Sequence, residues 1–146
     1  MTFDAVFWLA NVYVVPFWIL LILAPRWEWT QRICGSLLIF VPLALTYAVL
    51  LIPIAVRVSQ GLPDVSTTEG VAQILSIPFA AAVGWIHYLV FDLFVARWAY
   101  FDSRERQIPA RWVSPTLFVI YNLGPFGLLL YLGVRTLHSR RQQTLS

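Results

Sequence analysis

Charged residues are scarce in this sequence, and lysine is absent altogether. Only 12% of the 146 residues are charged, whereas a soluble domain carries about 25%. All of the basic residues are arginine. The hydrophobic share is 60% and the mean hydropathy is +0.75, which excludes an ordinary water-soluble globule. The formal net charge of +3 is too small to indicate a nucleic-acid partner.

Cysteine is nearly missing too, since Cys34 stands alone. A single cysteine excludes an internal disulfide. The sequence contains no Cys/His cluster with metal-ligand spacing, no Gly-rich phosphate loop and no nucleophile elbow. A second histidine that would complete a bis-histidine haem site inside the apolar segments is absent as well. We therefore expect no metal and no cofactor.

Long apolar runs are what the sequence does contain. A bilayer-spanning helix needs about 20 predominantly apolar residues. Four runs meet this length: 3–24, 33–56, 79–100 and 114–134. We predict an all-α integral membrane protein in which these runs are four transmembrane helices of a single domain, residues 1–146. Nothing basic precedes the first run, so we interpret it as a mature helix and not as a signal peptide.

A polar region separates the second run from the third. Its segment 60–64 has the composition of a turn, and Ser66 with Glu69 fits a capping box. Apolar residues follow at helical spacing, so we expect a short interfacial helix at about 67–77. An ordinary connecting helix is the alternative. We expect 101–113 to be a short polar turn and the tail from Arg135 to fray.

Aromatic residues collect around the two short connections, as they do at a membrane interface. They are Trp27, Trp29, Trp98, Tyr100 and Trp112. Their shared side supports four spans that alternate in direction. The same side carries slightly more arginine, which favours cytoplasmic short connections and both termini outside. The expected location is a bacterial inner membrane or a thylakoid-type membrane.

Ionisable residues lie inside the third run. Counting about 1.5 Å per residue from Phe79 places His87 about 12 Å and Asp92 about 20 Å deep in a core about 30 Å thick. A carboxyl group at that depth is costly and indicates function, the alternative being a hydrogen bond that joins helices. Arg97 either reaches the membrane surface or pairs with Asp92. Asp92 shares a helix face with Gly84, Tyr88 and Ala96, so we expect this face to pack against protein.

Depth counting also places polar residues in two layers. Asn11, Tyr47 and His87 lie about 12–14 Å from the side of the long connection, and Asp92 and Asn122 about 12 Å from the other side. Unpaired polar groups are costly in hydrocarbon. We therefore expect each layer to converge inward. His87 and Asp92 are about 140° apart around their helix, so a joint role needs a substrate or another helix between them.

One string in the third run is specific. It reads Trp85-Ile86-His87-Tyr88-Leu89-Val90-Phe91-Asp92-Leu93-Phe94-Val95-Ala96-Arg97-Trp98, and Asp102-Ser103-Arg104 follows. With Asn11, Pro16, Ala24–Trp27 and Leu123–Leu128, it resembles small four-span proteins related to the plant abscisic-acid-deficient protein required for making neoxanthin. The resemblance covers nearly the whole chain. It implies a membrane protein of xanthophyll or isoprenoid metabolism, which in plants converts the epoxide violaxanthin to the allene neoxanthin.

The plant substrate does not carry over with the resemblance. No plastid-targeting extension precedes the first run, so we expect a bacterial or a processed protein. The chemistry of the family still suggests roles for this chain's residues. Opening an epoxide to an allenic alcohol needs an acid for the departing oxygen and a base for a carbon-bound proton, with no redox cofactor. We interpret a protonated Asp92 as the acid and neutral His87 as the base. The candidate substrate-binding residues are Asn11, Tyr47, Tyr88, Arg97 and Asn122.

Two hypotheses of different class remain. The first is a cofactor-independent, neoxanthin-synthase-like isomerase that acts on a carotenoid or another long isoprenoid between the helices. The second is a non-catalytic protein that binds pigment or lipid or assists a membrane complex, in which the same polar residues join helices. A small transporter, working as a homo-oligomer, is a third and weaker alternative.

Overall fold

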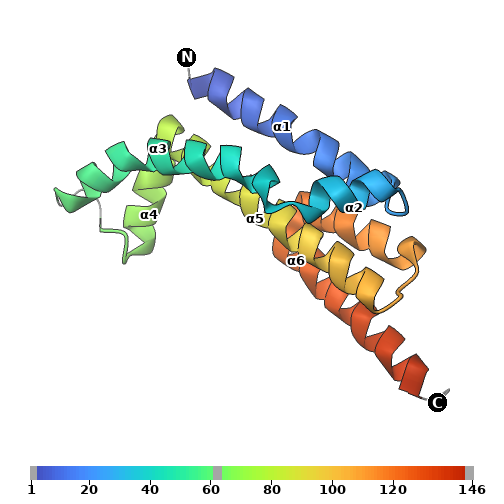
Figure 1. Cartoon of the computed structure of the whole chain (residues 1–146). Helices are drawn as coiled ribbons and strands as arrows, with labels where there is room; N and C mark the ends of the chain where they lie inside the picture. Colours follow the sequence, from blue (N-terminus) through green and yellow to red (C-terminus); the bar gives the residue numbers. More distant parts are fainter. Residues whose placement is uncertain (1–2, 61–63, 144–146) are drawn as a thin grey trace. The chain divides into compact units, whose positions relative to one another are not determined.

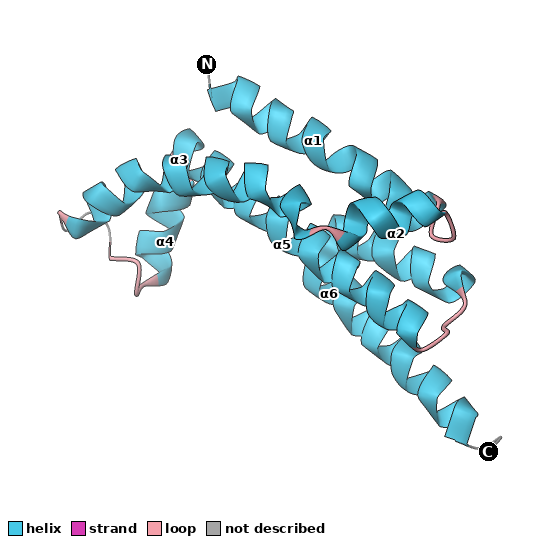
Figure 2. Cartoon of the chain, viewed as in Figure 1, coloured by secondary structure: helices cyan, strands magenta, loops and turns pink. Residues whose placement is uncertain are grey.

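The computed structural model describes residues 3–60 and 64–143 of the chain (Figure 1). Throughout these two ranges the regular elements are helices, and strands are absent (Figure 2). The predicted all-α class is therefore confirmed. Helices form so readily here because a chain in hydrocarbon must satisfy its own backbone hydrogen bonds, and a helix does so within one segment.

Six α-helices and one short 3-10 helix make up the described chain. They are α1 (Phe3–Leu23), α2 (Glu28–Gly35), η1 (Leu37–Phe40), α3 (Val41–Ser59), α4 (Thr68–Leu75), α5 (Pro78–Glu105) and α6 (Ala110–Gln143). Four segments are long and apolar enough to cross a membrane: Asp4–Leu23, Leu37–Arg57, Pro78–Glu105 and Ala110–Arg141. The four predicted spans are thus confirmed by length and composition.

The sequence prediction missed α2 and started the second span too early. The span begins at Leu37, whereas Ile33 belongs to α2. Thr30 and Cys34 are fully buried and four residues apart, so α2 is a short amphipathic helix with one buried face. Ser36 then has extended backbone, and its hydroxyl oxygen accepts a hydrogen bond from the Leu38 amide. The apolar run continues through this break, so hydropathy alone does not reveal it.

The third connection is much shorter than the predicted turn 101–113. Helix α5 continues to Glu105 and ends in a Schellman cap, in which the Ile108 amide donates to the Ser103 carbonyl at 2.8 Å. The Gln107 amide donates to the Arg104 carbonyl at 3.1 Å. Helix α6 also runs on to Gln143, so the expected fraying from Arg135 is wrong over the described residues.

The predicted helix at about 67–77 is present as α4, but its cap is shifted by one residue. The hydroxyl oxygen of Thr67, and not that of Ser66, accepts the hydrogen bond from the Gly70 amide. Ser66 instead donates to the carboxylate of Asp64. A Cβ atom on Gly70 would overlap the Asp64 carbonyl oxygen, so the turn requires glycine there.

The chain divides into two compact units, each built from two separate stretches. Unit 1 comprises Met1–Tyr13 and Phe40–Val90, and unit 2 comprises Val14–Ile39 and Phe91–Ser146. Because the division falls within α1 and α5, each of these helices contributes to both units. A single domain stays a prediction.

Each unit has its own buried apolar residues. Those of unit 1 include Ala10, Phe40, Leu43, Ala80, Val83 and Ile86. Those of unit 2 include Val14, Trp18, Leu21, Leu93, Ala96, Leu117 and Ile120. In unit 2 the second part of α5 lies beside α6, to which the short connection joins it (Figure 1). Small residues such as Ala96 and Ala99, both fully buried, allow helices to approach closely.

Candidate functional site

Asp102 holds together the end of α5 and the second half of α6. Its Oδ2 accepts a hydrogen bond of 2.5 Å from the Tyr131 hydroxyl and lies 3.0 Å from Arg135 Nε. Its Oδ1 accepts a hydrogen bond of 2.9 Å from Arg106 Nε. The carboxylate therefore has three partners and is 11% exposed. The sequence shows only that Arg106 follows Asp102 by four residues. The other two partners are distant along the chain, so this cluster was not predicted.

Arg97 stabilises the carboxyl end of α2. Its Nε donates to the Cys34 carbonyl at 2.6 Å and its Nη2 to the Gly35 carbonyl at 2.7 Å. A cation there satisfies free carbonyls and opposes the negative end of the helix dipole. Within the described residues Arg97 forms no ion pair with Asp92, so that predicted alternative is wrong. Burial raises the pKa of the Cys34 thiol to about 11, an effect that the charge of Arg97 opposes.

The predicted aromatic belt is present for tryptophan but not for tyrosine. Trp27, Trp29, Trp98 and Trp112 are exposed in unit 2. Tyr100 is 1% exposed, and its hydroxyl donates to the Pro25 carbonyl at 2.8 Å. Its predicted place in an interfacial belt is therefore wrong, because it links the end of α1 to α5.

Asp92 has a different environment, beside a break in α6. The backbone of α6 leaves helical geometry at Leu123 and Gly124, immediately before Pro125. Proline lacks an N–H and disrupts the preceding turn. A Cβ atom built on Gly124 would lie 2.5 Å from Asp92 Oδ1, so the carboxyl group occupies the space that this glycine leaves.

The Asp92 side chain is half-buried and makes no hydrogen bond or ion pair with any described residue. The predicted second layer paired it with Asn122. The Asn122 side chain is instead exposed and donates to the Phe118 carbonyl of its own helix at 2.8 Å. The expected inward orientation of Asn122 is therefore wrong. The side chain of an asparagine in a helix can donate to the carbonyl four residues earlier, so it needs no partner on a second helix.

The first predicted layer lies in unit 1. The rings of Tyr47 and His87 have centroids 5.6 Å apart, and Asn11 Oδ1 accepts a hydrogen bond of 3.1 Å from Trp85 Nε1. The contact of His87 with Tyr47 agrees with the predicted layer, but the His87 side chain is exposed and not buried as expected. Tyr88 is 62% exposed, so the face it shares with Asp92 packs against protein only in part.

An apolar groove of about 260 Å³ lies between α1 and the first half of α6 in unit 2. It is lined by Val15, Trp18, Ile19, Ile22, Leu23, Phe118 and Tyr121. The Trp18 ring contacts the Tyr121 ring at 5.1 Å, while its buried indole N–H has no hydrogen-bond acceptor among the described residues. Apolar and aromatic side chains therefore line this groove almost entirely.

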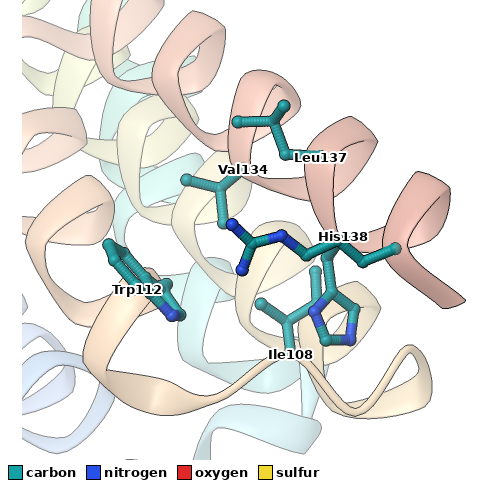
Figure 3. A pocket seen from close by; sticks show the side chains of 6 residues that line it. Ile108, Trp112, Val134, Leu137 and His138 are labelled. Carbon is teal, nitrogen blue, oxygen red and sulfur yellow. The ribbon is translucent and has the colours of Figure 1, made fainter.

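A smaller hollow of about 170 Å³ lies at the far end of α6 (Figure 3). Ile108 and Trp112 face Val134, Leu137 and His138 across it. A metal site does not form in this region or elsewhere in the described chain, where no three His, Cys, Asp or Glu side chains cluster.

Comparison with known proteins gives one consistent result. The sequence model of the family described as ABA4-like, ABA DEFICIENT 4-like, matches residues 5–131. Among curated proteins, "Protein ABA DEFICIENT 4, chloroplastic" of Arabidopsis thaliana is 33% identical over 116 residues. The match covers 74% of this chain and 51% of the relative, so the chain spans about half of the relative's length. No solved structure matches.

Proposed function

Because this chain belongs to the ABA DEFICIENT 4-like family, we propose that it acts on an oxygenated carotenoid or a related long isoprenoid in the membrane. The reaction that we propose is a cofactor-independent isomerisation of the epoxide-to-allene type, in which Asp92 supplies the acid. Four apolar helices fit a membrane location, where such a substrate dissolves. The family membership supports the substrate class, and the surroundings of Asp92 support the chemistry.

The unpartnered carboxyl group of Asp92 carries this proposal. A carboxyl group in the middle of a spanning helix costs about 2.5–3.5 kcal/mol even on the lenient insertion scale. No hydrogen bond or ion pair between Asp92 and a described residue offsets this free-energy cost. Hydrocarbon favours the neutral form of a carboxyl group. A neutral carboxyl group beside the α6 break keeps its O–H available to a substrate oxygen.

The proposed step is balanced without an oxidant or reductant. The Asp92 O–H gives its proton to the epoxide oxygen as one carbon–oxygen bond breaks. A base removes a proton from the adjacent vinylic carbon, and the electrons of that carbon–hydrogen bond form the second double bond of the allene. The product is an isomer of the substrate that carries a new hydroxyl group. His87 as the base stays a prediction, to be tested by His87→Gln.

A second candidate function, pigment or lipid binding without catalysis, has its own support in unit 2. The groove beside Trp18 is lined by apolar and aromatic side chains from two helices. Its volume of about 260 Å³ is below the range of about 300–1,000 Å³ typical of small-molecule pockets. The groove therefore has room for one end of a long apolar molecule. Both candidate functions require a site for such a molecule.

The test is turnover of a defined epoxide by the full chain. Protein reconstituted in phosphatidylcholine nanodiscs is incubated with violaxanthin, and an isomer of equal mass is sought by liquid chromatography and mass spectrometry. We expect Asp92→Asn to lower product formation by about 100-fold or more, as expected for removal of a general acid. Glu105→Gln makes the same chemical change at an exposed position of α5 and should retain activity.

The possible results separate the two candidates. Wild-type turnover by Asp92→Asn would exclude the acid role. If the wild-type chain retains violaxanthin through purification but forms no isomer, the non-catalytic candidate is favoured. Because violaxanthin is the plant substrate, a matched set of mono-epoxide and di-epoxide carotenoids would extend the assay.

A further inference from the structure

A polar hollow of about 230 Å³ lies in unit 2 where α1 ends and α5 connects to α6. Its polar lining comes from three segments and includes Arg26, Tyr100, Ser103, Arg104 and Gln107. Exposed tryptophans flank these same segments, at positions 27, 29 and 112. Tryptophan side chains concentrate at the level of lipid headgroups. The hollow is therefore at the height where phosphate groups of a bilayer lie.

The charge that lines the hollow is positive. Arg26 is exposed and forms no hydrogen bond or ion pair with any described residue. Arg104 donates one hydrogen bond, from Nη1 to the Pro25 carbonyl at 3.1 Å, which leaves its other donors available. No carboxylate is among the lining residues. Asp102 on the same helix is already bound by Arg106 and Arg135.

Gln107 is the left-handed residue of the Schellman cap that ends α5. Its φ of 54° lies in the left-handed region, which strains a residue with a side chain. Glycine is the residue preferred at this cap position because it has no Cβ. The exposed Gln107 side chain lines the hollow. The Gln107 amide group therefore adds uncharged N–H donors to the two arginines of the lining.

We propose that this hollow binds the phosphate of an anionic membrane phospholipid. Arg26 and Arg104 neutralise the phosphate, and the Gln107 amide donates a hydrogen bond to it. Guanidinium groups match phosphate oxygens geometrically and are attracted to anionic lipid surfaces. About 230 Å³ holds a headgroup but not acyl chains, which would extend into the bilayer. This site does not depend on the isomerase proposal, because Asp92 is not part of it.

Electron spin resonance of spin-labelled lipids tests the assignment. The full chain is reconstituted in phosphatidylcholine vesicles, and the association constants of spin-labelled phosphatidylglycerol and phosphatidylcholine are compared. We expect wild type to prefer phosphatidylglycerol, and Arg26→Gln to lower that preference about five-fold, the effect of about one basic residue near an anionic surface. Arg57→Gln, an exposed arginine of α3, is the matched control and should change the preference less than two-fold.

Gln107→Gly provides a second variant that is expected to fold well, since it relieves the left-handed strain. It should lower the phosphatidylglycerol preference while raising thermal stability. Raising the ionic strength should weaken the preference of wild type. The proposed site would be overturned if Arg26→Gln and Arg57→Gln lowered the phosphatidylglycerol preference equally, or if Gln107→Gly left that preference unchanged. Full competition by inorganic phosphate would show a free-anion site instead of a lipid site and would also overturn the proposal.

Discussion

Asp102 lies at the end of α5 and has three partners, whereas Asp92 lies earlier on the same helix and has none among the described residues. The partners of Asp102 come from the turn after α5 and from α6, so the carboxylate joins these two segments. Asp92 meets α6 only at a glycine, where the helix is broken. Both carboxyl groups thus belong to α5 and lie against α6, but only that of Asp102 has hydrogen-bond and ion-pair partners there.

This comparison separates an acid that stabilises the fold from one that is available for chemistry. A buried carboxylate that is fully hydrogen-bonded contributes to stability mainly because its loss leaves other charges unpaired. A carboxyl group with no partner gains no stabilising interaction, and inside a membrane it is a candidate functional residue. Substitutions at the two positions should therefore affect different measurements.

The largest expected effect on stability is that of Asp102→Asn. It removes the charge that Arg106 and Arg135 neutralise, and it weakens the hydrogen bond from Tyr131. Both arginines are about one-third exposed, so we expect a loss of about 2 kcal/mol, below the usual cost of breaking a fully buried pair. Unfolding in detergent micelles measures it. Asp92→Asn should change stability by less than about 0.5 kcal/mol, and equal losses at both positions would remove the distinction.

Removing only the tyrosine hydroxyl sharpens the same comparison. Tyr131→Phe deletes the 2.5 Å hydrogen bond to Asp102 while it keeps the ring that packs against Trp98. We expect a loss of about 1.5 kcal/mol, typical of a hydrogen bond to a charged group. Tyr121→Phe on the same helix is the control, since its side chain is exposed. If both substitutions cost the same in thermal unfolding, the Asp102 cluster has no special role.

Gly124→Ala should displace the Asp92 side chain while it leaves the carboxyl group chemically unchanged. The added Cβ would lie 2.5 Å from Asp92 Oδ1, and this flexible side chain would have to move. We expect product formation to fall about ten-fold, because displacing a reacting group by about 1 Å is costly. Gly133→Ala adds a Cβ where nothing lies within 4 Å and should retain activity. Stability is measured in parallel, and a matching loss of folded Gly124→Ala protein would show that the glycine serves the helix break instead.

The effect that is smallest at neutral pH concerns Cys34, outside the spans. Burial raises the pKa of its thiol from 9.0 to about 11, so folding favours the neutral form. This contribution is complete below about pH 9 and is lost as the pH rises toward about 11. Unfolding curves between these pH values should show a fall in stability that is smaller in Cys34→Ala. At pH 7 the thiol should react slowly with maleimide, and rapid labelling would contradict the buried environment.

Hydrophobicity and length were enough to predict the four spans, because a helix that crosses hydrocarbon must be apolar over about 20 residues. Asp92 was identified as a candidate because a carboxyl group within an apolar run is costly in hydrocarbon. Helix ends were less well predicted. The cap at Gln107 and the break before Leu37 depend on backbone angles and hydrogen bonds that an apolar run does not encode.

Tertiary structure alone decided which polar residues meet. The spacing along α5 allows a pair of Arg97 with Asp92, but Arg97 donates instead to the carbonyl groups at the end of α2. Tyr131 and Arg135 converge on Asp102 from a different helix, and no sequence period records that approach. The sequence by itself determined an all-helical membrane protein with one conspicuous acid in its third span. Packing determined that this acid would lie against Gly124 while Asp102 was neutralised, because partners from separate helices are chosen by distance in space and not along the chain.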